Sequence, residues 1–227
     1  MTAPTRRDGP VPDAHRPGRV VVVAGTATEI GKTWVGARLA EALRVNGFRV
    51  AARKPVQSFE PGAGPTDAEV LAAASGEEPE VVCPSHRWYP VAVAPPMAAD
   101  VLGRPPIRLA DLVAELAWPS PVAEVGLVET AGGVRSPLAD DGDTVALATA
   151  IAADLVVLVA DAGLGTINAV RLAADVLADA AVPVVVVLNR FASDDDLHRR
   201  NAAWLRAEGR IVRTDVEHLV ADVAGAR

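Results

Sequence analysis

Cysteine and aromatic residues are scarce in this sequence of 227 residues. The one cysteine, Cys83, excludes an intramolecular disulfide and a zinc site made of several thiolates. That usage is typical of a reducing compartment, so we expect a cytoplasmic protein in which Cys83 is a buried thiol and not a nucleophile. Aromatic residues make up 4% of the chain, whereas Ala and Val dominate, which suits a tightly packed parallel sheet covered by Ala-rich helices.

Positive charge and long apolar runs are also scarce. The formal net charge is −7, so the chain offers no basic surface to nucleic acid or to an anionic membrane. No apolar run reaches the roughly 18 residues that a membrane-spanning helix needs. Residues 1–18 hold four Pro and several charges but no apolar signal-peptide core. We therefore expect a disordered N-terminal tail over residues 1–18 and a single domain over residues 19–227.

Short apolar runs alternate with Ala-rich segments of helical period along that domain. The expected strands are residues 20–24, 48–52, 125–128, 155–160 and 182–188. The expected helices are residues 34–46, 66–75, 107–117, 144–152, 167–180 and 195–208. Residues 58–65 and 88–97 are expected to be loops because Gly and Pro interrupt them. The alternation predicts an α/β fold with a doubly wound, mostly parallel sheet and helices on both faces.

The most informative segment runs from Gly25 to Thr33 and reads GTATEIGKT. It follows an expected strand and opens an expected helix, which is the context of a phosphate-binding loop, although five residues separate Gly25 from Gly31 where four are usual. Backbone N–H groups and the positive end of the helix dipole would hold phosphate oxygens. Lys32 would neutralise the β- and γ-phosphates and the Thr33 hydroxyl would ligate Mg²⁺. The segment predicts a P-loop NTPase-like domain.

Polar residues stand at the ends of four other expected strands. They are Lys54, Glu129, Asp161 and Asn189. In a doubly wound sheet, ligands bind outside the carboxyl ends of the strands, so we expect these side chains to lie beside the phosphate loop.

Several roles follow from these positions. Lys54 would stabilise charge on a transferring phosphoryl group, or else be an ordinary surface lysine, and Ser58 could contact phosphate or substrate. Asp67 opens a helix, so it is either a cap or a Mg²⁺ ligand beside Thr33. Glu129 could complete the metal site, while glycines such as Gly132 let the backbone approach an anion.

Taken together, the motifs resemble those of the dethiobiotin synthetase family. Six stretches carry the resemblance: Gly25 to Thr33, Lys54 to Ser58, Asp67, Val128 to Gly133, Leu164 to Asn168, and Asn189. The resemblance spans roughly residues 20–208. It implies an ATP-dependent ligase of biotin biosynthesis, in which 7,8-diaminopelargonate reacts with CO₂ to give a carbamate. ATP then phosphorylates the carbamate, and the second amine closes a ureido ring with loss of phosphate.

The resemblance also implies residue roles. Lys32 and Lys54 would hold the γ-phosphoryl oxygens, and Thr28 and Ser58 would contact the diamine or its carbamate. The loop residues Glu29, Ile30 and Gly31 would surround the phosphates, and Asn189 would read the purine base. Mg²⁺ would be held by Thr33, Asp67 and Glu129. Gly132 would approach the substrate. The family forms homodimers with the substrate site at the subunit interface, so Leu164, Gly165 and Asn168 would bind the carboxylate of the substrate held by the partner subunit.

Two departures from the family pattern keep other functions open. Thr130 and Phe59 both stand where the family has Gly, and we expect both to add bulk near the substrate pocket. They would suit a related ATP-dependent carboxylase or ligase acting on another amine. A partitioning-type ATPase is a weaker alternative because the segment Gly25 to Ile30 lacks its extra lysine. A GTPase is disfavoured because the residues after Asn189 do not form an NKxD motif.

Overall fold

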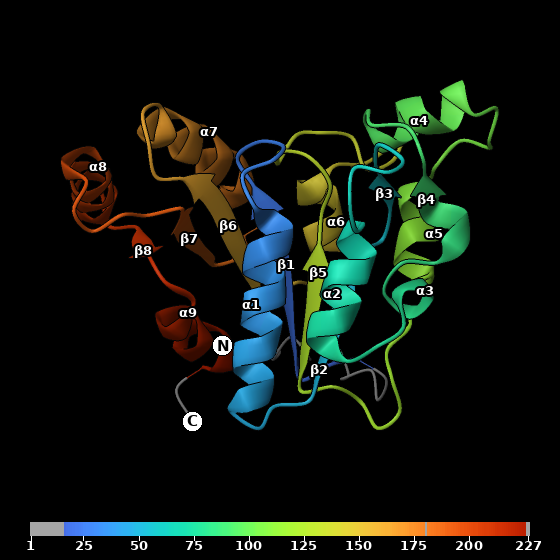
Figure 1. Cartoon of the computed structure of the whole chain (residues 1–227), viewed down its shortest axis with the longest axis horizontal. Helices are drawn as coiled ribbons and strands as arrows, with labels where there is room; N and C mark the ends of the chain where they lie inside the picture. The colour runs from blue at the N-terminus through green and yellow to red at the C-terminus, as the bar shows by residue number, and fades with distance from the viewer. Residues whose placement is uncertain (1–15, 180, 226–227) are drawn as a thin grey trace, which may run out of the picture.

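The computed structural model describes residues 16–179 and 181–225. Its centre is a six-stranded sheet in the order β2–β5–β1–β6–β7–β8, and every neighbouring pair of strands is parallel. The strands are β1 (Arg19–Gly25), β2 (Val50–Arg53), β5 (Val125–Glu129), β6 (Leu155–Asp161), β7 (Val184–Asn189) and β8 (Ile211–Arg213). Because all six run in one direction, their carboxyl ends form a single edge, at the top of Figure 1.

Alternation along β1 explains why the sheet is covered on both faces. Val20, Val22 and Ala24 belong to the apolar core on one side, whereas Val21 and Val23 belong to the core on the other. Successive side chains of a strand point to opposite faces, so a continuous Val run fills both cores.

Helices cover both faces, as expected for a doubly wound sheet. The first core is covered mainly by α6 (Thr144–Ala150), α7 (Thr166–Ala178) and α8 (Asp196–Ala207), with α4 (Pro95–Val101) and α5 (Leu109–Ala114) beside them. The second is covered by α1 (Lys32–Val45) and α9 (Val216–Ala224). Next to α1 and β2 lies α2 (Asp67–Ser75), which packs with α3 (Pro79–Val82) over Cys83. The predicted fold class is therefore confirmed.

Several short elements lie in segments that the sequence pattern left as loops. A two-stranded parallel sheet joins β3 (Gln57–Ser58) to β4 (Trp88–Tyr89), which follows the 3₁₀ turn η1 (Ser85–Arg87). The helix α4 begins inside the expected loop 88–97, with Pro95 and Pro96 in its first turn. Proline cannot occupy a helix interior, but its missing N–H costs nothing at the first helical position. These two prolines therefore start a helix instead of preventing one.

The expected N-terminal tail falls largely on residues 1–15, which lie outside the described residues. Its last residues are described and pack against the domain: Arg16 donates to Asp154 Oδ2 at 2.7 Å, and Pro17 is buried. In the described part of the chain, no helix is long and apolar enough to cross a membrane.

Candidate functional site

The phosphate loop leaves β1 at Gly25 and enters α1 at Lys32. Gly31 adopts φ 90° and Glu29 adopts φ 59°, so two residues of the loop occupy the left-handed region. A Cβ on Gly25 would lie 2.8 Å from Ile30 Cδ1 and 2.9 Å from Lys32 Cδ, so a larger residue there would displace these two side chains. The loop therefore curls tightly over the end of β1 and leaves the first N–H groups of α1 facing the edge of the sheet.

Lys32 is held against the loop itself. Its side chain is largely buried, and its Nζ donates to the carbonyl of Ala27 at 3.1 Å. Burial, reinforced by the nearby positive charge of Lys54, lowers the pKa of Lys32. An anion arriving at the loop would reverse that effect, because it would stabilise the charged amine.

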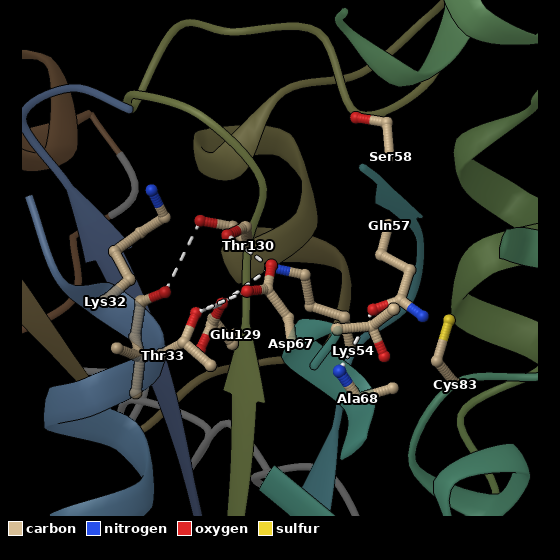
Figure 2. A network of polar contacts seen from close by, with 12 residues as sticks. Lys32, Thr33, Lys54, Gln57, Ser58, Asp67, Ala68, Cys83, Glu129 and Thr130 are labelled. Carbon is tan, nitrogen blue, oxygen red and sulfur yellow. Dashed lines mark hydrogen bonds and ion pairs between the residues drawn. The ribbon is translucent and has the colours of Figure 1, made fainter. Parts of the chain in front are cut away.

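Behind the loop, one cation and two carboxylates form a compact cluster (Figure 2). The Nζ of Lys54 lies 2.6 Å from Glu129 Oε1 and 2.6 Å from Asp67 Oδ2. The Thr33 hydroxyl oxygen lies 2.7 Å from Asp67 Oδ1 and 2.9 Å from Glu129 Oε1, so its single hydrogen can be donated to either carboxylate. Lys54, directly after β2, thus meets residues of α2, β5 and α1 at one point. Of the four strand-end residues expected beside the phosphate loop, Lys54 and Glu129 belong to this cluster, whereas Asn189 contacts the loop elsewhere and Asp161 pairs with Arg190.

Burial and pairing act in opposition within this cluster. Lys54 is 1% exposed, and although burial alone would lower its pKa, the carboxylates of Glu129 and Asp67 raise it above the ordinary lysine value. Burial raises the pKa of Glu129 despite the attraction of Lys54. The pKa of Asp67 is lowered, since the attraction of Lys54 and the hydrogen bond from Thr33 outweigh its burial. Lys54 is therefore a charged, buried lysine and not the solvated surface residue that the sequence left open.

The start of α2 fixes Asp67 in this cluster. Thr66 caps the helix by accepting from the N–H of Glu69, while the Glu69 carboxylate accepts from the Thr66 N–H at 2.6 Å. Gln57 Oε1 accepts from the N–H of Ala68 at 3.0 Å. Thr66 is thus the cap, and Asp67, the first helical residue, is left to face Thr33 and Lys54.

The residues fit a magnesium ion by their chemistry. Thr33, Asp67 and Glu129 offer hydroxyl and carboxylate oxygens, the hard ligands that Mg²⁺ prefers. Glu129 Oε2 is buried and has no hydrogen-bond partner among the described residues, so the second oxygen of this carboxylate is left for a ligand. In the same part of the chain no three His, Cys, Asp or Glu residues form a metal cluster, so an ion here would take its other ligands from phosphate and water.

A cleft of about 660 Å³ opens above the cluster. Among its lining residues are the predicted residues Thr28, Glu29, Gly31, Lys32, Thr33, Lys54, Ser58, Asp67 and Gly132. Ser58 donates to the carbonyl of Val93 at 2.6 Å, so the loop before α4 closes one wall. Phe59 lines the cleft and meets Trp88 edge-on, which confirms that this departure adds bulk to the pocket.

The other departure, Thr130, does not add bulk to the pocket, contrary to the sequence-based expectation. Its side chain is 1% exposed and does not line the cleft. Its N–H donates to the carbonyl of Val23 at 3.1 Å, and its hydroxyl lies 3.4 Å from the same oxygen. Thr130 therefore faces β1, and the neighbouring Ala131 and Gly132 form the cleft wall.

Asn189 lies on the far side of the phosphate loop, at the end of β7. Its Nδ2 donates to the carbonyl of Ile30 at 2.8 Å, so this hydrogen bond ties the phosphate loop to the end of β7. Beside it is a second hollow of about 530 Å³, whose lining includes Gly31, Trp34, Asn189, Arg190 and Phe191. The sequence pointed to Asn189 but not to Trp34, Arg190 or Phe191, because none of these stands in a motif.

Leu164, Gly165 and Asn168 lie apart from the cleft. They line a separate hollow of about 480 Å³ over the start of α7. Leu164 is 92% exposed and Leu172, in the same hollow, is 62% exposed. Within one chain these residues line neither the phosphate-loop cleft nor the hollow beside Asn189.

The scarcity of lysine points to the site independently of the motifs. The chain has only two lysines, Lys32 and Lys54, against twenty arginines, and both lie in the cleft. Lysines retained in an otherwise arginine-based sequence are a signal of function, because an ammonium is a compact point charge that arginine does not replace. Ser136, which also lines the cleft and accepts from the Gly133 N–H at 2.9 Å, carries no such signal.

Several known proteins are similar in sequence to this chain. A family model described as an AAA domain matches residues 19–221. The chain is 36% identical to the ATP-dependent dethiobiotin synthetase of Corynebacterium efficiens over 78% of its own length and 77% of the relative's. It is 38% identical to the enzyme of the same name from Anaeromyxobacter dehalogenans, over 78% of this chain and 79% of that one.

Solved structures share the fold at much lower identity. A plasmid partition protein from Borrelia burgdorferi is 11% identical and superposes with a TM-score of 0.54, over 92% of this chain and 96% of that one. A DUF1611 family protein from Anabaena variabilis is 21% identical with a TM-score of 0.51, over 92% of this chain and 56% of that one. At such identities the likeness concerns the fold alone.

Proposed function

Because this chain belongs to the ATP-dependent dethiobiotin synthetase family, we propose that it carboxylates 7,8-diaminopelargonate with CO₂ and closes the ureido ring of dethiobiotin. As a member of that family it is an ATP-dependent ligase that forms C–N bonds. The substrate, the order of steps and the residue roles below are our proposal. It rests chiefly on one observation: Thr33, Lys54 and Asp67 line an open cleft beside a phosphate loop, and all three are joined to each other or to the buried Glu129 beneath it.

The first step forms a carbamate. One amine nitrogen of the substrate attacks the carbon of CO₂, a C–N bond forms, and the amine proton goes to solvent. Thr28 and Ser58 both line the cleft, where they would orient the diamine. Ser58 already donates to the Val93 carbonyl, so its oxygen remains able to accept a hydrogen bond from a substrate amine.

The second step transfers a phosphoryl group. A carbamate oxygen attacks the γ-phosphorus of ATP, the bond to the β-phosphate oxygen breaks, and ADP leaves with the electron pair. Lys32 and Lys54 would stabilise the charge on the transferred group. Lys54 is suited to this role because its ion pairs with Glu129 and Asp67 hold its amine charged and fixed in position. Little reorganisation is then needed during the reaction.

The third step closes the ring. The second amine attacks the carbonyl carbon of the mixed anhydride and loses a proton to solvent, the C–O bond to phosphate breaks, and phosphate leaves with the electron pair. Orientation supplies most of the acceleration here, because both reacting groups belong to one bound molecule. Phe59 and the loop before α4 form the wall of the cleft that would limit the conformations of that molecule.

Thr33, Asp67 and Glu129 would hold Mg²⁺ in the second step. The ion would neutralise charge on the β- and γ-phosphate oxygens. The orphaned Glu129 Oε2 and the oxygen-only character of these ligands support this assignment.

We also propose a cytoplasmic homodimer. The support is the exposed hollow at the start of α7, where Leu164 and Leu172 project from the surface beside Gly165 and Asn168. N–H groups at that helix start would bind the carboxylate of a substrate held in the partner subunit.

The direct test supplies purified protein with diaminopelargonate, bicarbonate, Mg²⁺ and ATP and searches for dethiobiotin by mass spectrometry. Ureido product formed in a one-to-one ratio with ADP supports the proposal, and Lys32→Ala is the inactive control. ATP turnover that responds to other diamines, but not to diaminopelargonate, would favour the related ligase that Phe59 keeps open. Turnover stimulated by DNA and not by any amine would favour a partitioning-type ATPase.

A further inference from the structure

Two consecutive residues at the end of β7 hold two consecutive carbonyl groups of the phosphate loop. Asn189 Nδ2 donates to Ile30 O at 2.8 Å, and Arg190 Nη2 donates to Glu29 O at 3.0 Å. The loop starts from β1, and β7 is two strands away in the sheet, so these contacts join distant parts of the chain. Asn189 belongs to a family motif, but no motif includes Arg190.

These contacts determine where the loop N–H groups point. A trans peptide is planar, and its N–H points opposite to its C=O. The C=O of Glu29 and the N–H of Ile30 belong to one peptide unit, so a carbonyl held toward β7 turns that N–H away from β7. In the same way, the bond to the carbonyl of Ile30 turns the N–H of Gly31 away from β7. Neither of these N–H groups donates a hydrogen bond among the described residues, so both are free for phosphate oxygens.

The backbone at both ends of the Arg190 contact is unusual. Glu29 has φ 59° and Arg190 has φ 57°, a region that costs free energy for residues other than glycine. Strain of this kind persists only where surrounding contacts enforce it. The Arg190 guanidinium also lies 3.5 Å from Asp161 Oδ2, so it bridges the carbonyl of Glu29 and the carboxylate at the end of β6.

We propose that Arg190 is a positioning residue for ATP: it holds the Glu29 peptide so that the Ile30 N–H faces the triphosphate. Arg190 acts through the loop and does not need to touch the nucleotide. The inference depends on the proposed function only in that the loop binds a polyphosphate.

The test compares probes that represent parts of ATP. Affinities for MgATP, tripolyphosphate and adenosine are measured by calorimetry for the wild-type chain and for Arg190→Gly. Glycine accepts the positive φ without strain but lacks the guanidinium. We expect Arg190→Gly to bind ATP and tripolyphosphate about tenfold more weakly, as for the loss of one charge-assisted hydrogen bond, with adenosine affinity unchanged. Unfolding in urea should show no loss of stability, since the strain at this position is relieved.

Two further variants separate this role from simple attraction. Arg190→Lys keeps the positive charge but lacks the planar fork, so we expect it to lose affinity for tripolyphosphate as well. Arg199→Ala removes an exposed arginine that pairs with Asp196 on α8, and it should bind all three probes like the wild type.

Three results would overturn the inference. They are wild-type tripolyphosphate affinity in Arg190→Gly, full retention of that affinity in Arg190→Lys, and a loss in Arg190→Gly that is as large for adenosine as for ATP. The last would make Arg190 a contact of the base or ribose. No amine or bicarbonate is present, so a failure of the ureido chemistry would leave these results unchanged. A wild-type chain that binds neither ATP nor tripolyphosphate would instead reject the phosphate loop itself.

Discussion

Lys32 and Lys54 are close neighbours, yet their surroundings move their pKa values in opposite directions. Lys54 faces two carboxylates, which keep it charged although it is buried. Lys32 donates to a backbone carbonyl and pairs directly with neither carboxylate, so burial and the charge of Lys54 outweigh the attraction of Glu129 and Asp67 and lower its pKa. A buried cation is tolerated where paired and is destabilising where it is not. The two residues therefore differ in chemical reactivity before any substrate arrives.

This difference predicts selective labelling. An amine-acylating reagent should modify Lys32 well before Lys54, because the neutral amine is the nucleophile and Lys32 is neutral at lower pH than an ordinary lysine. Peptide mass spectrometry over a range of pH values measures both sites, with the N-terminal amine as internal reference. ATP with Mg²⁺ should protect Lys32. Faster modification of Lys54 than of Lys32 would show that the two environments have been assigned the wrong way round.

Replacing Lys32 by methionine separates catalysis from stability. Lys32→Met keeps the buried stem and loses the charge, so turnover should fall about a hundredfold or more. A lysine whose pKa is lowered by folding weakens the folded state below that pKa, where the amine is charged, and the effect fades as pH rises. At pH 7 the variant should therefore be at least as stable as wild type in urea. Near-normal turnover would remove Lys32 from the reaction.

At the scale of elements, the sequence predicted those helices and strands whose hydrophobic pattern is local. The Val-rich strands and the helix after the phosphate loop were predictable because a short window contains their period. The two-residue strands β3 and β4 were not, since each gains stability only from the other, some thirty residues away. Pro95 and Pro96 were misread because a proline that breaks a helix interior also suits its first turn.

The same distinction applies to the site. Lys32, Thr33, Lys54, Asp67 and Glu129 were predictable because each stands at a strand end or helix start. Thr130 was misplaced in the cleft because nothing in its neighbours reveals that its side chain faces β1. The contact of Arg190 with Glu29 depends on the positive φ values of both residues and on how β1 and β7 are aligned on either side of β6. No short motif encodes either property.

The capping of α2 links an element to the metal site. Thr66→Ala removes the capping box and should cost about 1 kcal/mol of unfolding free energy. It should also raise the Mg²⁺ concentration needed for half-maximal turnover, because Asp67 is the next residue and would be held less firmly. Asp195→Ala, which removes the cap of α8, is the matched control. A similar change in Mg²⁺ requirement in both variants would attribute the effect to general loosening.

At the scale of the molecule, six parallel strands bring residues from most of the chain to one edge. The cleft takes its residues from β1 to the loop after β5, while the hollow at α7 faces elsewhere. The cleft and the α7 hollow are therefore separate surfaces of the chain. In the proposed homodimer, the α7 hollow of one subunit would complete the phosphate-loop cleft of its partner.

A charge at Leu164 tests that arrangement. Leu164→Asp places a carboxylate where the proposed dimer binds one, so it should raise the KM for the amine at least tenfold and favour the monomer in light scattering. ATP affinity should not change, because the phosphate loop belongs to the same chain. Val45→Asp, at another exposed apolar position, should alter none of these. A dimeric Leu164→Asp enzyme with normal kinetics would contradict a shared site.

The most direct test of the reaction follows oxygen from CO₂ into phosphate. The enzyme is supplied with diaminopelargonate, ATP, Mg²⁺ and ¹⁸O-labelled CO₂ for times shorter than its exchange with water. Attack of a carbamate oxygen on the γ-phosphorus, followed by cleavage of the C–O bond, should place one ¹⁸O in each released phosphate and leave the other in the ureido carbonyl. Unlabelled phosphate without ureido product would mean that water is the acceptor, and would contradict carbamate phosphorylation in this cleft.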